Sequence, residues 1–204
     1  MQLSGANKLA THTEEELEQK LIEIVERNKW LQEAFSAANG IFGEYYIGAG
    51  AVTQAVWNEI SGYHPQHGIG DMDIVYFNDG DFTEAGEKAI EKRLQSMLHP
   101  FPFKIDVKNE ARVHLWYENK FGYAIQPYTS LEAAIDTWPT TATAIGIRKD
   151  EKGTYTVYAP YGLGDLFRMI VRANKVQITS EIYEAKAVKW KGRWPTLTVI
   201  PWEG

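Results

Sequence analysis

Two aspartates separated by one residue, Asp71 and Asp73, lead into the apolar stretch MDIVYF. Successive side chains of a β-strand point to opposite faces of its sheet, so a strand here sends both carboxylates to one face and Met72 to the other. Carboxylates held side by side repel each other, which raises the pKa of one of them unless a cation bridges the pair. The pattern predicts a strand with a core-facing side and a carboxylate side.

Magnesium would relieve this repulsion, because it prefers oxygen ligands and is usually held by one or two protein carboxylates plus substrate phosphates. A second strand is predicted at 103–107 from alternating apolar and charged residues, and it places Lys104 and Asp106 on one face. Asp106 is therefore a candidate third ligand. The alternative for Asp-x-Asp alone is a solvated strand end, because so short a motif occurs often by chance.

Upstream of the aspartates, IGAGAV predicts a strand at 45–47 that turns sharply into a helix. Small residues at such a turn let phosphates approach the backbone at a helix N-terminus. Gly48, Gly50 and Ala51 are the candidate nucleotide-binding residues of this turn. A tight turn without a ligand is the alternative.

The other periodic segments indicate helices and strands in one α/β (α+β) domain that spans 1–204, with a core at about 40–172 and a C-terminal extension at 173–204. An N-terminal helix is predicted at 13–38, begun by a capping box of Thr13 and Glu16. The segment 61–70 has the composition of a loop, and the extension is aromatic and interrupted by proline. Further helices are predicted at 83–98, 131–136 and 163–171, and further strands at 142–147 and 155–158.

Composition narrows the class of protein. The 204 residues contain no cysteine, which excludes disulfides and zinc-thiolate sites. No segment approaches the roughly 18 apolar residues of a membrane span, and the first ten residues lack a signal pattern, so we expect a soluble cytoplasmic protein without membrane contacts. The net charge of -6 argues against broad electrostatic binding to nucleic acid, and no DNA partner is expected.

The ordered combination of the turn, the Asp-x-Asp strand and a third aspartate on a later strand resembles the DNA polymerase beta-like nucleotidyltransferases. Within them the chain is similar to a bacterial nucleotidyltransferase-like family. The matching stretches cover most of 46–172 and are GAGAVTQAVWN, DMDIVYF, KIDVKNEARVHLWY, FGY followed by PYTSLEAAIDTWPTTATAIGIR, and APYGLGDLFRMIVR.

This resemblance implies a polymerase-beta-like core, with a small mixed sheet flanked by helices. It also implies Gly48 and Gly50 on the phosphate-binding turn, and Asp71, Asp73 and Asp106 as catalytic ligands of Mg2+, or of Mn2+ instead. The chain differs from the broader superfamily in two respects. It has Gly48-Ala49-Gly50-Ala51 where paired glycines or Gly-Ser are usual, and its stretch from Gly50 to Asp71 is longer.

Three further side chains are candidates for nucleotide binding. Lys108 falls on the Asp106 side of its strand, where it could bind phosphate or neutralise the aspartates. Trp138 is a candidate for a base or sugar pocket, and Arg148 for a planar contact with phosphate. Structural roles are the alternative for both. The choice between a role in the site and a structural role also stays open for His64 and His67 in the 61–70 loop, for Arg112 and His114 after Asp106, and for Thr140, Thr141 and Thr143 after Trp138.

The expected function is metal-dependent transfer of a nucleoside monophosphate from a nucleoside triphosphate to a hydroxyl acceptor, with release of pyrophosphate. The acceptor stays open among an RNA end, a protein and a small molecule. The main alternative is a catalytically inactive regulatory module that binds nucleotide or metal. A purely structural protein is disfavoured, because it leaves the three converging carboxylates without a role.

Overall fold

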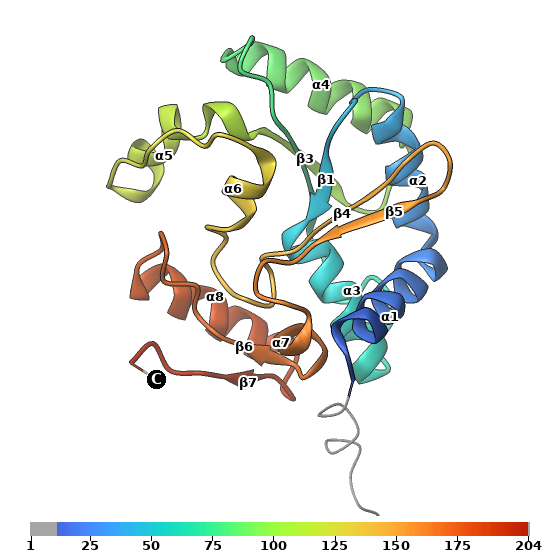
Figure 1. Ribbon diagram of the computed structural model, residues 1–204, viewed down its shortest axis with the longest axis vertical. Coiled ribbons are helices and arrows are strands. Elements are labelled where there is room, and N and C mark those ends of the chain that lie inside the picture. The colour runs from blue at the N-terminus through green and yellow to red at the C-terminus, as the bar shows by residue number, and fades with distance from the viewer. Residues whose placement is uncertain (1–11, 204) are drawn as a thin grey trace, which may run out of the picture.

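The computed structural model describes residues 12–203 and has a five-stranded mixed sheet at its centre (Figure 1). The strand order is β3-β2-β1-β4-β5, with β2 and β3 parallel and the other neighbours antiparallel. The strands are β1 (Tyr46–Gly48), β2 (Asp71–Tyr76), β3 (Lys104–Asn109), β4 (Gly146–Lys149) and β5 (Tyr155–Tyr158). The small mixed sheet flanked by helices that the family resemblance implies is confirmed.

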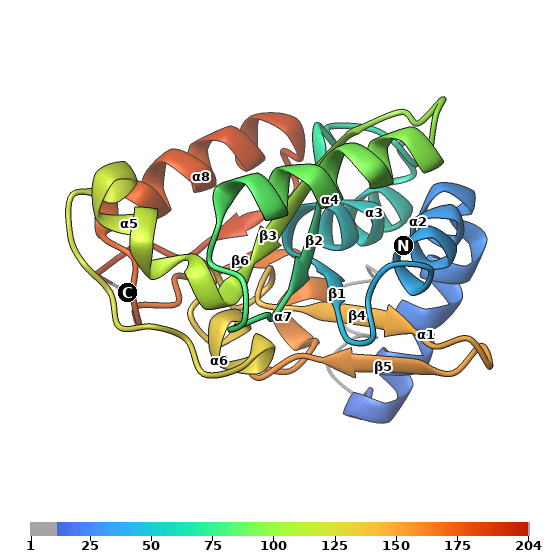
Figure 2. The same ribbon diagram turned by 90° about the horizontal axis from the view of Figure 1, so that it is seen from above.

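The helices surround this sheet, and a second, two-stranded parallel sheet lies near the C-terminus (Figure 2). The helices are α1 (Glu14–Arg27), α2 (Lys29–Asn39), α3 (Ala49–Ser61), α4 (Glu84–Met97), the 3-10 turn η3 (Glu110–Arg112), α5 (His114–Phe121), α6 (Leu131–Ile135), α7 (Gly164–Phe167) and α8 (Ser180–Arg193). The second sheet pairs β6 (Ile170–Val171) with β7 (Thr198–Val199). Within the described residues, no helix is long and apolar enough to cross a membrane.

The two faces of the central sheet have different partners. One face packs Met72, Ile74 and Ile105 into the main hydrophobic core beneath α3 and α4 (Figure 2). The opposite face carries a smaller apolar cluster that contains Tyr46 and Val75 and is covered by α6. Because side chains alternate along a strand, Asp71 and Asp73 share the face of Val75, as the sequence predicts.

The predicted helix at 13–38 is wrong in one respect, because the chain forms two helices there. Asn28 between α1 and α2 has an extended backbone (φ -87°, ψ 97°), and its side-chain amide donates to the Ile24 carbonyl at 2.8 Å. Asparagine competes for backbone hydrogen bonds in this way and ends helices. The capping box at the start of α1 is confirmed, since Thr13 and Glu16 exchange hydrogen bonds of 3.0 and 3.3 Å.

The C-terminal extension is more ordered than its sequence indicates, because it contains α8 and β7. Trp194, at the end of α8, is fully buried and donates its indole N–H to Asn58 on α3 at 2.8 Å. Gly68 has a left-handed backbone with no room for a side chain against the Trp194 ring, and its carbonyl accepts from Arg193 at 2.6 Å. The 61–70 loop therefore packs on the C-terminal segment.

Two other predicted elements are shorter than expected. The helix at 163–171 is limited to α7, and β4 begins only at Gly146 because the chain forms a turn at 141–143. That turn is closed by Thr140, whose carbonyl accepts from the backbone of Thr143 and Ala144. Local hydrogen bonds of this kind compete with a strand ladder.

Candidate active site

Three strands bring Gly48, Asp73 and Asp106 into one row across the sheet. Gly48 on β1 is the register partner of Asp73 on β2, and Asp73 is the register partner of Asp106 on β3. Asp71 lies two residues before Asp73 on the same face, at the exposed first position of β2. The two central carboxylates thus lie on adjacent strands, beside the turn that begins α3.

The surroundings of Asp73 change the pKa of its carboxyl group. Its pKa is raised to about 7, first by burial and then by the negative charges of Asp71 and Asp106, while Lys186 and Lys108 oppose the shift. Repulsion among neighbouring carboxylates is what the Asp-x-Asp pattern predicts for this face. The site is therefore one that a bound cation would stabilise.

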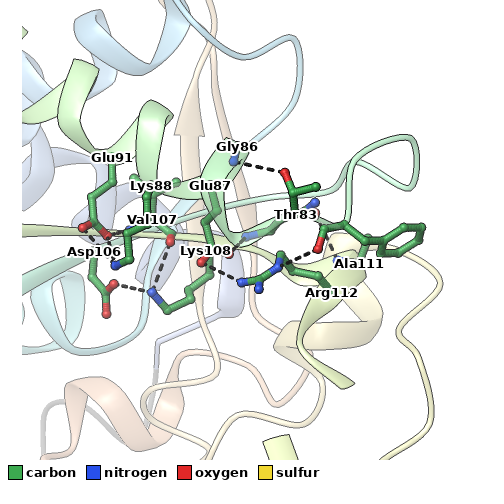
Figure 3. Close-up of polar contacts among 12 residues, drawn as sticks. Thr83, Gly86, Glu87, Lys88, Glu91, Asp106, Val107, Lys108, Ala111 and Arg112 are labelled. Atoms are coloured by element: carbon green, nitrogen blue, oxygen red, sulfur yellow. Dashed lines mark hydrogen bonds and ion pairs between the residues drawn. The ribbon is translucent and has the colours of Figure 1, made fainter. Parts of the chain in front are cut away.

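Lys108 lies on the Asp106 side of β3 and forms an ion pair with the Asp106 carboxylate, as Figure 3 shows. Its ammonium also donates to the Val107 carbonyl at 3.1 Å. The neutralising role considered for Lys108 is thus present in the structure. A contact between Lys108 and phosphate is compatible with this position and stays a prediction.

A cavity of about 380 Å³ lies against the carboxylates. Asp73, Asp106 and Lys108 line it together with Ala49 at the start of α3. Much of the remaining wall is aromatic and consists of Trp116, Tyr117, Phe121, Tyr128 and Trp138. The cavity thus joins charged groups to rings on which a nucleobase can stack.

Gly48 is required by close packing at the end of β1. A Cβ at this position would lie 2.6 Å from the Ile145 carbonyl oxygen and 2.6 Å from the Trp138 ring. Neither neighbour can move easily, because one is backbone and the other fills the cavity wall. Gly48 therefore allows Trp138 to lie directly against the turn.

The left-handed residue of the turn is Ala49, with φ of 48°, and not one of the two glycines. Its N–H donates to the Ile145 carbonyl at 3.1 Å, and no side chain caps the start of α3. The first N–H groups of a helix have no intrahelical partner and can bind an anion. Gly50 lies within the first turn of α3, whereas the Ala51 side chain is buried in the main core.

We expect Gly48→Ala to lower the free energy of unfolding by roughly 2 kcal/mol, the usual scale of overpacking in a filled site. Gly50→Ala is the matched control, because its Cβ would meet only the end of the Gln54 side chain, at 3.0 Å, and no backbone atom or ring. Urea denaturation of both variants measures the difference. Equal stability of Gly48→Ala and the parent protein would show that Trp138 can retreat from the turn without cost.

Several sequence candidates lie away from the cavity. Arg148 on β4 forms an ion pair with Glu44 at 2.6 Å and covers the Tyr46 ring, so the structure does not bring it to the carboxylates. Arg112 is buried and pairs with Glu87 at 2.9 Å (Figure 3).

Histidines and threonines considered from the sequence also have structural partners. His67 contacts the Arg193 carbonyl at 3.1 Å, and His64 contacts the backbone N–H of Gln66 at 3.3 Å. Thr140 bonds to Thr143, and Thr141 donates to Asp165, each at 2.8 Å. None of these side chains, nor that of His114, lines the cavity.

Three charged residues of the cavity were not predicted from the sequence: Glu110, Lys120 and Lys186. Glu110 is buried in η3, and its pKa is raised to about 8, first by burial and then by the charges of Asp73 and Glu87. Strand alternation ends before η3, so it gives no indication where Glu110 points. Lys186 belongs to α8, whose position against the cavity follows from long-range packing.

The carboxylates fit a divalent cation in donor chemistry and in charge, although they do not form a complete ligand set. Among residues 12–203, no group of three or more His, Cys, Asp or Glu side chains is arranged to hold a metal ion. Asp73 and Asp106 offer oxygen ligands from adjacent strands. This agrees with the way magnesium is held by one or two carboxylates and substrate phosphates.

Comparisons with known proteins identify the family and the fold of this chain. Residues 38–199 match the family described as Nucleotidyltransferase. The chain is also similar to a protein whose NMR structure reveals a CCA-adding enzyme head domain, with a TM-score of 0.72 and 24% sequence identity over 90% of this chain and 95% of the other. That likeness shows the fold. The search of curated proteins found no match to the chain. Because the family match spans most of the sequence, the chain belongs to the nucleotidyltransferase family.

Proposed function

We propose that this protein transfers a nucleoside monophosphate from a nucleoside triphosphate to a hydroxyl acceptor and releases pyrophosphate, with Mg2+ or Mn2+ as cofactor. The observation that carries the proposal is the pairing of Asp73 with Asp106 in a cavity beside the start of α3. Membership of the family supports nucleotidyl transfer in general. The metal dependence and the acceptor class are the proposed additions.

Asp73 and Asp106 would hold the divalent cation, with Asp71 as a further ligand. Such ions polarise the phosphoryl oxygens and lower the pKa of the attacking hydroxyl. The raised pKa of Asp73 supports this role, because a nearby positive charge would offset the repulsion from Asp71 and Asp106.

The remaining residues of the site bind and orient the reactants. The free N–H groups at the start of α3 face the phosphates, Lys108 adds a positive charge, and the Trp138 ring supports the base or sugar. The acceptor oxygen forms a bond to the α-phosphorus. The bond from that phosphorus to the α,β-bridging oxygen breaks, and its electron pair leaves with pyrophosphate. Asp106 accepts the hydroxyl proton and passes it to solvent.

The acceptor is an RNA end, a protein hydroxyl or a small molecule. A long nucleic acid is the weaker candidate because the chain has a net charge of -6. The cavity of about 380 Å³ has the size of a small-molecule site, so it can hold a nucleotide and admit only the end of a larger acceptor.

A screen with each α-labelled triphosphate, Mg2+ and separate RNA, protein and metabolite fractions tests the proposal. We expect label on one fraction, pyrophosphate in equal amount, and loss of both when a chelator removes the metal. Nucleotide binding without turnover on any fraction would favour the inactive regulatory module instead. Asp79→Asn, at an exposed turn residue, is the control variant for activity.

A further inference from the structure

Lys186 extends from α8 toward the carboxylates. It lines the cavity one helical turn after Ile182, so both side chains lie on the same side of α8. Burial lowers the pKa of Lys186, an effect opposed by the negative charges of Asp73 and Asp71. In residues 12–203 its ammonium has no carboxylate within ion-pairing distance. The Lys186 ammonium lies 5.7 Å from the centre of the Trp190 ring. This partly buried cation therefore faces the cavity with an aromatic neighbour but, among the described residues, without an ion-pair partner.

Lys120 on α5 lines the same cavity from a second helix. Its ammonium lies 5.3 Å from the centres of both the Trp116 and Phe121 rings, and no ion pair engages it in the described part of the chain. The positive charges of Lys189 and Lys120 both contribute to the lowered pKa of Lys186, and of these two lysines Lys120 is the one that lines the cavity. The ammonium groups of Lys186 and Lys120 therefore repel each other across the cavity. Bringing like charges together is unfavourable unless an anion lies between them.

Lys108 differs from these two lysines because its ammonium is already paired with Asp106. The cavity wall thus contains two kinds of lysine. Lys108 is ion-paired with a carboxylate, whereas Lys186 and Lys120 on the covering helices form no ion pair within the described residues. An anion with several charges fits the unpaired lysines best, because ammonium groups form strong charge-assisted hydrogen bonds to phosphate oxygens.

We propose that Lys186 and Lys120 form the subsite that binds the β- and γ-phosphates of the nucleoside triphosphate and retains pyrophosphate until its release. The identity of this substrate rests on the proposed function. If Lys186 binds these phosphates, α8 of the C-terminal segment supplies a ligand-binding residue of the triphosphate site in addition to packing against the core. The subsite also gives a reason for the protein to prefer triphosphates over monophosphates, because only the former extend to the two lysines.

Calorimetric titration with inorganic pyrophosphate tests the subsite without requiring turnover. The full chain is titrated with pyrophosphate and with orthophosphate, each in the presence and absence of Mg2+. Lys186→Met removes the charge while keeping a long apolar stem. Lys189→Met is the matched control, since it removes the same charge from an exposed position of α8 outside the cavity.

We expect Lys186→Met to weaken pyrophosphate binding about tenfold or more, the usual scale for one charge-assisted contact. Lys186→Arg should bind more tightly than Lys186→Met, Lys120→Met should weaken binding as well, and Lys189→Met should change it by less than about threefold. Thermal unfolding of each variant checks that the fold is intact.

Two results would overturn the subsite: no pyrophosphate binding by the parent protein under either condition, or binding by Lys186→Met as tight as that of the parent. Failure of the proposed function would look different. In that case pyrophosphate would still bind through Lys186, but no triphosphate would be turned over with any acceptor.

Discussion

Asp73→Asn should abolish metal-dependent nucleotidyl transfer and, without divalent cations, stabilise the fold at pH 8. The activity should fall about a thousandfold or more, because a bound metal ion supplies several kcal/mol of transition-state stabilisation and each factor of ten corresponds to about 1.4 kcal/mol. The stability should rise by roughly 2 to 4 kcal/mol, because asparagine removes a buried charge next to Asp71 and Asp106.

The pH dependence of that stability gain has a definite sign. The pKa of Asp73 is raised from 3.8 to about 7 in the folded state, so folding favours the protonated form. The parent protein should therefore lose stability relative to Asp73→Asn as the pH rises from about 4 to about 7, and the difference should stay constant above pH 7.

Urea denaturation with a chelator present, at several pH values, measures this difference. Asp79→Asn, in the exposed turn after β2, should change neither stability nor activity. Retained transfer in Asp73→Asn would disprove its role as a ligand. Unchanged stability at pH 8 would show that the carboxylate is better solvated than its surroundings indicate.

Glu110→Gln should have the second large effect, an increase in the free energy of unfolding at high pH. The pKa of Glu110 is raised from 4.5 to about 8, first by burial and then by the charges of Asp73 and Glu87. The folded state thus disfavours the ionised form. The parent protein should lose stability relative to Glu110→Gln as the pH rises from about 4.5 to about 8, reaching roughly 3 kcal/mol at pH 8 and above.

Glu118→Gln is the control for this experiment, because Glu118 lies on the exposed side of α5, eight residues further along the chain. Thermal unfolding between pH 5 and 9 should show little change for that variant. A constant difference between Glu110→Gln and the parent at all pH values would contradict the account, because it would mean that Glu110 does not titrate differently in the folded and unfolded states.

Local patterns were sufficient to predict β2, β3 and the face on which their carboxylates lie, whereas the mixed sheet as a whole was implied by the family resemblance. The alternation around Met72 predicted a core-facing side chain, and Met72 is fully buried. The same rule placed Lys108 beside Asp106, where the two side chains form an ion pair. These predictions succeeded because a strand fixes side-chain direction with a period of two residues.

The unpredicted features depend on interactions between distant segments. The aromatic residues of 173–204 suggested an irregular tail, but Trp190 and Trp194 pack against Trp57 and fix α8 in place. Lys186 reaches the cavity as a result. Arg148 was a candidate for phosphate binding because of its chemistry, yet the structural alternative holds, since Glu44 and Tyr46 engage its side chain away from the cavity.

The turn before α3 also depends on a contact between residues that are distant in the sequence. Gly48 and Gly50 were predicted to let phosphates approach the backbone, but the residue with a left-handed backbone in this turn is Ala49. Gly48 is needed instead because Trp138, ninety residues later, occupies the space of a side chain. Sequence spacing alone does not reveal such a contact.

Positional labelling of the triphosphate tests the central claim most directly. The parent protein and Asp73→Asn are incubated with acceptor fractions and Mg2+, using triphosphate labelled either at the α- or at the γ-phosphorus. We predict that the parent protein moves the α-label to an acceptor and releases the γ-label as pyrophosphate, and that Asp73→Asn does neither. Transfer of the γ-label to the acceptor, or equal transfer by both proteins, would contradict nucleotidyl transfer at the paired aspartates.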